Sequence, residues 1–253
     1  MKRRITFVNH ATLLIELDGV NILTDPIYGL MVSPVVPRLQ RPGIPLDDLP
    51  PLDLILISHN HYDHLHLGTL RRLARRDPTT ILLPLGDARY GQRSGFQDIV
   101  ETRWWETVKR KGTRITAVPA KHEGGRFPWG RDKSICCGYV LEASGTTLYY
   151  AGDTGYAEMF KEIGARFKPE GALLPIGAYK PYDWFREIHL NPRSAVQAFL
   201  DLGAQFLVPY HWGTFKISDE PMSEPPALLR QEAEKSGILN CVHLLNNGES
   251  FSW

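Results

Sequence analysis

Short apolar runs recur along this chain, and several of them contain almost no polar residue. The run Leu52–Ile57 is followed by a polar loop and then by a helical stretch around Leu67–Arg76. A strand that is buried on both faces has such a near-continuous apolar pattern, and a helix directly after it is typical of layered α/β structure. The sequence therefore predicts an α/β fold in which a sheet is covered on both sides.

The two halves of the chain share one outline, in which a hairpin with a glycine turn is followed by an aspartate. The turns are Asp18-Gly19 and Ser144-Gly145, because glycine tolerates the positive φ of a tight hairpin. The aspartates that end the two units are Asp25 and Asp153. The strand segments are Ile5–Val8, Thr12–Leu17 and Val20–Leu23 in the first half, and Gly138–Glu142 and Thr147–Tyr150 in the second. We interpret this as a weak internal duplication within one domain that spans residues 1–253.

Other segments complete the predicted order of elements. Further strands are expected at Thr80–Pro84, Gln97–Thr102, Arg114–Pro119, Ala172–Pro175, Phe206–Pro209 and Val242–Leu245, and further helices at 156–166 and 192–202. Asn191 is a plausible N-cap of the last helix, with Pro192 at its first position. The proline-rich segment 26–51 predicts a long surface loop without helix or central strand. Such a loop could contact lipid or pack on the domain.

Charge and composition narrow the classes of partner and compartment. A formal net charge of +1 gives no electrostatic case for nucleic acid, which is usually bound by a strongly basic face. No segment approaches the ~18 consecutive apolar residues of a membrane helix. Three cysteines without a C-x-x-C pair are too few for a disulfide scaffold and favour reduced thiols. We therefore expect a soluble cytoplasmic protein, for which peripheral membrane contact stays open.

The segment Ser58–His64, Ser-His-Asn-His-Tyr-Asp-His, carries the clearest chemical signal. It places His59, His61, Asp63 and His64 in one loop directly after the predicted buried strand. The chain has only 9 histidines in 253 residues, so this grouping is improbable as a chance feature of a polar loop. Imidazole nitrogen and carboxylate oxygen together suit zinc and its first-row neighbours. The loop therefore predicts a metal site.

One loop cannot fill two metal shells, so further donors are expected at other strand ends. Three residues fit this expectation, namely His122, Asp153 and His211, each of which follows an apolar strand. Each of these three residues, considered alone, could equally be present because it forms a hydrogen bond to nearby backbone. As a set, at the ends of three strands, they favour one shared site.

These motifs, taken in order, resemble the metallo-β-lactamase superfamily, for which the H-x-H-x-D-H loop is specific. More narrowly, the chain resembles the branch of phospholipases D that hydrolyse N-acyl-phosphatidylethanolamine. The matching stretches are Asn9–Thr12, Leu23–Pro26, Ile57–His64, Ala151–Tyr156, Pro175–Tyr179 and His211–Phe215. The resemblance implies a four-layer αββα sandwich, with two metal ions at one edge between the sheets.

The resemblance also implies a ligand set. The first metal would be held by His59, His61 and His122, the second by Asp63, His64 and His211, with Asp153 bridging both. In the diiron relatives a glutamate replaces the second histidine of the loop, whereas this chain has His61. That difference favours two Zn²⁺ ions and hydrolysis over iron redox chemistry, with other first-row metals left open.

The expected reaction is hydrolysis of a phosphodiester in a phospholipid or small-molecule substrate. Two zinc ions ~3.5–4 Å apart can hold a shared hydroxide, because metal binding lowers the pKa of water to about 7. Asp63 and His189 are the expected catalytic residues. The branch has a histidine at the position of His189, which predicts phosphate binding or leaving-group protonation, although a role at the entry of the following helix is an alternative.

Two residues in the matched stretches are expected to support the metal ligands. His10 and Asp25 could orient a metal-bound group, because ligating histidines usually donate their other N–H to a partner. Alternatively, Asp25 is only a turn residue before Pro26, and His10 only a satisfied core histidine. The sequence leaves both readings open.

Two other functions remain compatible with the same residues. The first is a lactonase or other small-ester hydrolase on the same dinuclear site. The second is a metal-binding protein without useful catalysis that acts through a partner. The sequence does not fix the natural substrate, and it leaves a monomer and a homodimer both open.

Overall fold

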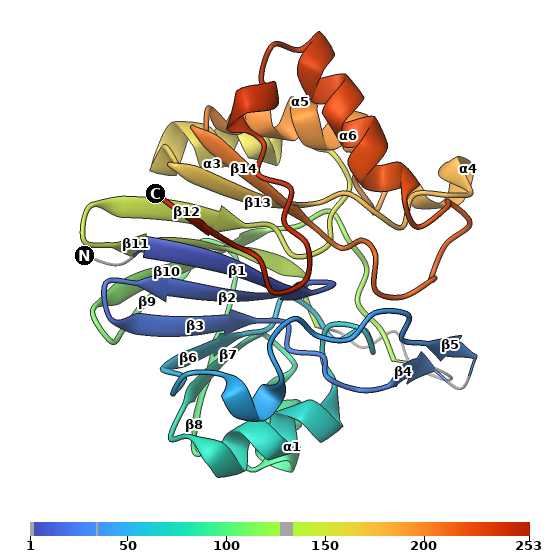
Figure 1. The fold of residues 1–253 in the computed structure, drawn as a ribbon. Coiled ribbons are helices and arrows are strands. Elements are labelled where there is room, and N and C mark those ends of the chain that lie inside the picture. Colours follow the sequence, from blue (N-terminus) through green and yellow to red (C-terminus); the bar gives the residue numbers. More distant parts are fainter. Residues whose placement is uncertain (1–2, 34, 127–133) are drawn as a thin grey trace.

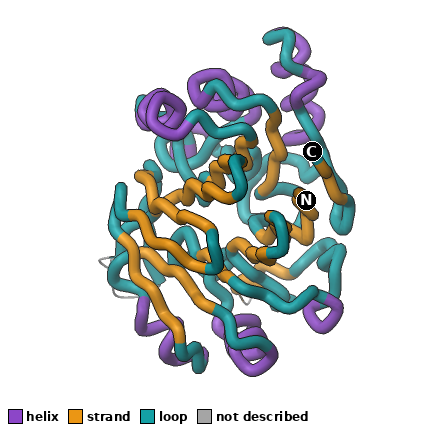
Figure 2. The backbone as a smooth tube through the Cα atoms, turned by 90° about the vertical axis from the view of Figure 1, so that its left-hand side faces the viewer, coloured by secondary structure: helices purple, strands orange, loops and turns teal. Residues whose placement is uncertain are grey.

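The computed structural model describes residues 3–33, 35–126 and 134–253 (Figure 1). Two sheets lie face to face, and helices cover the outer face of each (Figures 1 and 2). This arrangement confirms the predicted αββα sandwich. No helix among the described residues is long and apolar enough to cross a membrane.

The first sheet contains seven strands in the order β15-β1-β2-β3-β6-β7-β8. Their bounds are β1 Arg3–Asn9, β2 Thr12–Leu17, β3 Val20–Thr24, β6 Leu54–Leu56, β7 Thr80–Pro84, β8 Asp98–Thr102 and β15 Ser250–Ser252. Strands β15, β1, β2 and β3 pair antiparallel, whereas β3, β6, β7 and β8 pair parallel.

The second sheet contains six strands in the order β14-β13-β12-β11-β10-β9. Their bounds are β9 Thr107–Arg110, β10 Thr113–Pro119, β11 Cys137–Ala143, β12 Thr146–Tyr150, β13 Gly171–Pro175 and β14 Phe206–Tyr210. Strands β9 to β12 pair antiparallel, and β12, β13 and β14 pair parallel. Both sheets thus pass from antiparallel hairpins to parallel strands, in agreement with the duplication expected from the sequence.

The helices lie on two opposite faces of the sandwich. Helices α1 and α2 pack against the first sheet, and α3, α5 and α6 pack against the second (Figure 1). The helix bounds are α1 Leu67–Arg76, α2 Ala88–Ser94, α3 Met159–Phe167, α4 Tyr182–Phe185, α5 Pro192–Leu202 and α6 Glu224–Lys235, with short 3-10 helices η1 at Leu46–Asp48 and η2 at Leu239–Cys241. The predicted cap of α5 is confirmed, since Asn191 and Ser194 form a capping box.

Side chains in the central strands alternate between two separate cores. Leu54 and Leu56 enter the core between the sheets, whereas Ile55 and Ile57 enter the core under α1 and α2. Leu148 and Tyr150 likewise face the other sheet, while Tyr149 faces the helices. Because successive side chains point to opposite faces of a strand, a continuous apolar run satisfies both cores at once.

The prediction of a strand at Val242–Leu245 is wrong. Val242 forms only an isolated bridge to Leu207, beside the edge strand β14. The chain then leaves β14 through a turn in which the Glu249 N–H donates to the Asn246 carbonyl. The last strand is β15, which pairs with β1 in the other sheet.

The prediction that segment 26–51 lacks regular structure holds only in part. Two short strands, β4 Met31–Ser33 and β5 Val36–Pro37, form a separate two-stranded ribbon. Proline is tolerated there because β5 is an edge strand, where the absence of a backbone N–H costs little stability. Farther along the segment, Leu46 and Leu49 are buried in the core under α1. That end of the loop therefore packs on the domain, whereas Leu30 and Val35 stay exposed.

The inter-sheet core gives a direct test of the packing. Leu141 on β11 is buried there, whereas Leu200 on α5 is about half exposed. Leu141→Ala is expected to lower the free energy of unfolding by roughly 2–5 kcal/mol, because it removes buried methyl groups and leaves a cavity. The matched Leu200→Ala should change it by less than about 1 kcal/mol. Equal losses in urea-induced unfolding would contradict the layer assignment.

Candidate metal centre

The seven donor residues predicted from the sequence meet at one edge of the sandwich. They follow the ends of strands β6, β10, β12 and β14, which belong to both sheets. The loop after β6 supplies His59, His61, Asp63 and His64, and the other three strands supply His122, Asp153 and His211. Six of them fall into two groups whose potential ligand atoms lie within 4.8 Å of one another, and Asp153 lies against both, beside His122 on one side and beside His64 and His211 on the other.

The first group consists of three imidazoles. The Nδ1 atom of His61 lies 3.0 Å from Nε2 of His59 and 3.2 Å from Nε2 of His122. His59 is fully buried, whereas His61 and His122 are partly exposed. The group is therefore open to solvent on one side only.

The second group combines two imidazoles with two carboxylates. Oδ2 of Asp153 lies 3.1 Å from Nε2 of both His64 and His211, and these two nitrogens are 3.2 Å apart. Oδ2 of Asp63 lies 3.5 Å from the first nitrogen and 3.6 Å from the second. Four donor atoms thus lie close together on buried side chains.

Hydrogen bonds fix which ring nitrogen of each first-group histidine carries a lone pair. Nδ1 of His122 can only donate to the carbonyl of Ile188, 2.8 Å away, which leaves Nε2 as an acceptor. The Ser58 hydroxyl donates to Asp25 and therefore accepts from Nδ1 of His59. Two lone pairs consequently face Nδ1 of His61. One proton on that atom could satisfy only one of them, whereas a cation would satisfy all three nitrogens.

Asp25 organises both groups from behind. Its fully buried carboxylate accepts from Nδ1 of His64 at 2.7 Å, from the Tyr150 hydroxyl at 2.6 Å, and from the backbone N–H of Ser58 at 2.7 Å. Nε2 of His64 is thereby directed at the second group. The hydrogen-bonding role expected for Asp25 is present in the structure, so this residue is more than a turn residue.

His10 supports the other carboxylate of the second group. Its Nε2 lies 2.9 Å from Oδ2 of Asp63, and its ring lies tilted against that of His211, with centroids 4.1 Å apart. Burial and the neighbouring His211 lower the pKa of His10 to about 3, so the neutral ring donates one hydrogen bond. His10 therefore contacts two predicted ligands, and its side chain is held by Asp63 rather than by the core alone.

The second group holds protons when no metal is bound. Burial alone would lower the pKa of His211, but Asp153 and Asp63 outweigh it and raise this pKa to about 9. The same carboxylates, with Asp25, overcome burial and raise the pKa of His64 well above its ordinary value. In return, the protonated imidazoles hold the pKa of Asp153 well below its ordinary value despite burial. The negative charge of the two buried carboxylates must therefore be balanced, either by protons on the imidazoles or by a bound metal ion.

A metal ion fits this donor set. Oδ1 of Asp153 is buried and has no hydrogen-bond partner among the described residues, although a carboxylate oxygen in such a place normally has one. It belongs to the residue that faces both groups, since Asp153 also forms a potential ligand group with His122. Nitrogen and carboxylate donors at this spacing are the ligands that zinc and similar ions prefer.

Three residues at this edge have a strained backbone. His10, Asp25 and His211 have φ values of 47°, 33° and 64°, which side chains other than glycine rarely adopt. Such conformations cost about 1–3 kcal/mol each and persist at sites where the surrounding contacts enforce them. The cost at these three positions is consistent with a functional site.

His189 lies at the rim of the centre. Its Nδ1 is 3.9 Å from Oδ2 of Asp153 and its ring meets that of His122 edge-on, with centroids 4.9 Å apart. The helix that follows is capped by Asn191 instead. The side chain of His189 thus faces the centre and makes no capping contact with α5.

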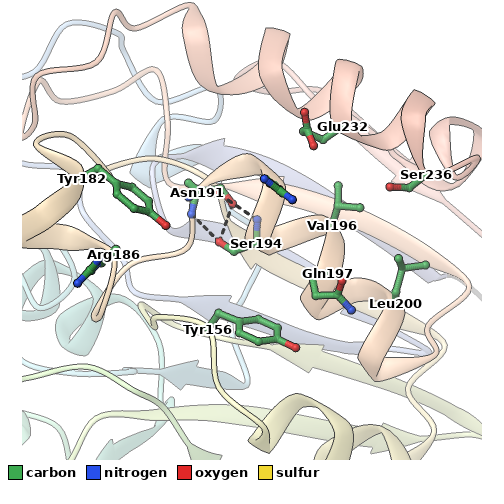
Figure 3. Close-up of a pocket in the computed structure, with 11 residues that line it drawn as sticks. Tyr156, Tyr182, Arg186, Asn191, Ser194, Val196, Gln197, Leu200, Glu232 and Ser236 are labelled. Atoms are coloured by element: carbon green, nitrogen blue, oxygen red, sulfur yellow. Dashed lines mark hydrogen bonds between the residues drawn. The ribbon is translucent and has the colours of Figure 1, made fainter.

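Some residues that shape the site carried no signal in the sequence. Ser58, Tyr150 and the carbonyl of Ile188 orient ligands, but each is an ordinary residue of a strand end or loop. Tyr150 alone could have been found from the sequence, because its position in an alternating strand places its side chain on the inner face of the sheet. A separate cavity of about 530 Å³ lies beside α5 (Figure 3), and Arg186 and Asn191 line it. None of the seven donors lines that cavity.

A family profile matches most of the chain. Residues 20–212 match the beta-lactamase superfamily domain. The chain belongs to the metallo-β-lactamase superfamily. A relative that it matches over almost its whole length is named a metal-dependent hydrolase.

Two relatives and one solved structure illustrate the similarity. It is 32% identical to an N-acyl-phosphatidylethanolamine-hydrolyzing phospholipase D of Caenorhabditis elegans, with 89% of this chain and 68% of that protein aligned. It is also 32% identical to a metal-dependent hydrolase of Methanopyrus kandleri, over 98% and 99% of the two chains. An isothiocyanate hydrolase from Delia radicum gut bacteria shares the fold, with a TM-score of 0.80 at 22% identity over 99% and 100% of the chains.

Relatives of this branch are often longer than the chain. It spans 66% of a 38%-identical protein from Mycobacterium tuberculosis and 50% of a 36%-identical phospholipase D of this type from Saccharomyces cerevisiae. These lengths concern the relatives alone. The metallo-β-lactamase fold and the phospholipase D-like branch, predicted from the motifs, are both confirmed.

Removing the buried carboxylate behind the ligands should weaken metal binding. Asp25→Asn keeps the size of the side chain but lacks the charge that holds Nδ1–H of His64. Loss of such a supporting partner typically lowers metal affinity 10–100-fold. A competition titration with a chromophoric chelator measures this. Asp53→Asn, at a surface position remote from the centre, is the control, and equal affinities of the two variants would contradict the assignment.

Metal binding should release protons. Below about pH 9 His211 carries a proton in the metal-free protein, and a metal ion needs the lone pair instead. Apparent affinity should therefore rise with pH, by up to about tenfold per unit for each displaced proton, and flatten above about pH 9 for His211. Calorimetric zinc titrations at pH 7 in buffers of different ionisation enthalpy count the protons. An enthalpy that is independent of the buffer would show that none is released.

Proposed function

We propose that this metallo-β-lactamase protein is a zinc-dependent phosphodiesterase of phospholipase D type. Its substrates would be N-acyl-phosphatidylethanolamine or related phosphodiesters. The observation that carries the proposal is the pair of donor groups, joined by Asp153, at the exposed edge of the sandwich. The relative in Caenorhabditis elegans, at 32% identity, supports the choice of substrate class.

The proposed ligands follow the two groups. His59, His61 and His122 would hold one Zn²⁺, and Asp63, His64 and His211 the other, with Asp153 contacting both. Neutral imidazoles outnumber carboxylates in this set, which suits zinc more than the harder cations that prefer oxygen. When bound, two such ions lower the pKa of water to about 7 and offset negative charge on phosphate oxygens.

The protein side chains around the ions have separate tasks. Asp63, fixed by His10, would both hold the second ion and turn one carboxylate oxygen toward the reacting face. Burial lowers the pKa of His189 to about 3, so its ring is neutral at physiological pH. A neutral ring is poorly suited to protonate a leaving group, but its N–H can donate to a phosphate oxygen. We therefore assign His189 to substrate binding.

The compartment and the reaction partners are part of the same proposal. All three cysteines are free in the structure, and we propose a reducing, cytoplasmic setting. A phospholipid or smaller phosphodiester would be the partner in the reaction.

A metal-analysed activity screen tests the function. The zinc-loaded protein is assayed on N-acyl-phosphatidylethanolamine, a simple phosphodiester and a lactone. The proposal expects the phosphodiesters to be hydrolysed at least ~100-fold faster than the lactone. The variant His61→Ala should lose bound zinc and hydrolysis together, whereas His243→Ala, whose ring stacks on Phe251 away from the centre, should keep both. Faster lactone hydrolysis would favour the lactonase reading, and no hydrolysis with full zinc content would favour the non-catalytic one.

His189 separates substrate binding from metal binding. In His189→Ala the zinc content should stay at the wild-type level, because the ring lies at the rim. Turnover should fall roughly 10–100-fold, as expected from a lost hydrogen bond to a charged phosphate worth about 1.5–3 kcal/mol. Inductively coupled plasma analysis and steady-state rates on the same sample measure both. Unchanged turnover would remove His189 from the site.

A further inference from the structure

Arg126 reaches across the loop that carries four of the predicted ligands. Its Nε donates to the carbonyl of Asn60 at 2.6 Å, and its Nη2 donates to the carbonyl of Leu65. His61, Asp63 and His64 lie between these two carbonyls. One planar guanidinium thus bonds both ends of the segment that supplies three ligands.

The same guanidinium packs on aromatic rings. Its carbon lies 4.3 Å from the centroid of Tyr62 and 5.1 Å from that of Tyr90. Tyr62 belongs to the same loop but offers no donor to either metal group, and the residue is 42% exposed. A cation over an aromatic face gains about 0.5–2 kcal/mol, so Tyr62 holds the arginine over the loop.

Arg126 also ties two ligand segments together. It lies four residues after His122, and its hydrogen bonds end on the loop of His61. The ligand atoms of these two histidines are 3.2 Å apart, although the residues are far apart in the sequence. A link between the two segments limits how far these nitrogens can separate.

The neighbouring loop residue is restrained in a similar way. The amide of Asn60 donates to Asp87 at 3.1 Å and to the Ser134 hydroxyl at 2.9 Å. The non-ligating positions of the loop are therefore fixed by side chains from three other segments. This pattern is expected where a metal site must be preorganised before the metal arrives.

We propose that Arg126 is a positioning residue that preorganises the first metal group. It acts by holding the backbone of the ligand loop against the segment that carries His122. The inference rests on the ligand roles proposed for His61 and His122. Lysine cannot replace arginine in this role, because a single ammonium cannot form the two-pronged contact or lie flat on Tyr62.

The test compares metal affinity and loop protection in four proteins. Arg126→Ala and Arg126→Lys are set beside His61→Ala and Arg72→Ala, the last removing an exposed arginine that pairs with Asp47 on the far side of α1. Zinc affinity is measured by competition with a chelator. Hydrogen exchange is measured in the metal-free proteins for the amides of His64 and Leu65, which both donate to the His61 carbonyl.

We expect both Arg126 variants to bind the more weakly held zinc 10–100-fold less tightly and to lose protection at His64 and Leu65 before any metal is added. Arg72→Ala should match the wild type in both measurements. Wild-type affinity and protection in both Arg126 variants would overturn the inference. If His61→Ala also bound zinc normally, the proposed ligand set itself would fail, which is a separate result. Should Arg126→Ala not fold, Arg126→Lys retains the charge and decides the question.

Discussion

Two buried carboxylates facing each other across two imidazoles are the constraint around which this structure is arranged. Asp63 and Asp153 lie in a nearly closed space with His64 and His211, where unbalanced negative charge is very costly. The carboxylates retain protons on both imidazoles in the metal-free protein, which shows how strongly the space favours positive charge. A metal ion supplies that charge by binding the nitrogen lone pairs that the protons otherwise occupy. The need for a cation follows from the side chains alone.

The sandwich fold meets this constraint by bringing strand ends together. Almost every residue of strands β6, β12 and β14 is buried, which restrains the ends of these strands. The donors stand on the loops just after these ends, while Asp25 and Tyr150 brace them from the first and second sheet. Rigid strands and hydrogen-bonded loops together hold donors from four segments within a few ångströms.

Much of the fold and of the metal site could be predicted from the sequence, because residues that lie close together in the chain determine them. Apolar runs fix the strands, and the loop His59–His64 concentrates donors that need no distant information. The cap of α5 was readable in the same way, from Asn191 and Pro192. The superfamily and its branch followed from short motifs that keep their order along the chain.

Other features depend on tertiary contacts and could not be read locally. Helix α6 begins at Glu224 and continues with two prolines, which fit its first turn but look like helix breakers in the sequence. Strand β9 contains only one apolar residue, Val108, and β15 exists because β1 offers an edge. The segment Val242–Leu245 looked like a strand by composition, yet no neighbouring strand pairs with more than Val242. Arg126 similarly acts through a fold contact that its own neighbours in the sequence do not suggest.

The central claim is that the seven side chains bind two metal ions. Anomalous X-ray diffraction at the zinc edge, on crystals of the protein grown with zinc, tests it most directly. The account predicts two peaks, one against His59, His61 and His122 and the other against His64, with Asp153 touching both. A single peak elsewhere on the surface, or none at this edge of the sandwich, would contradict it.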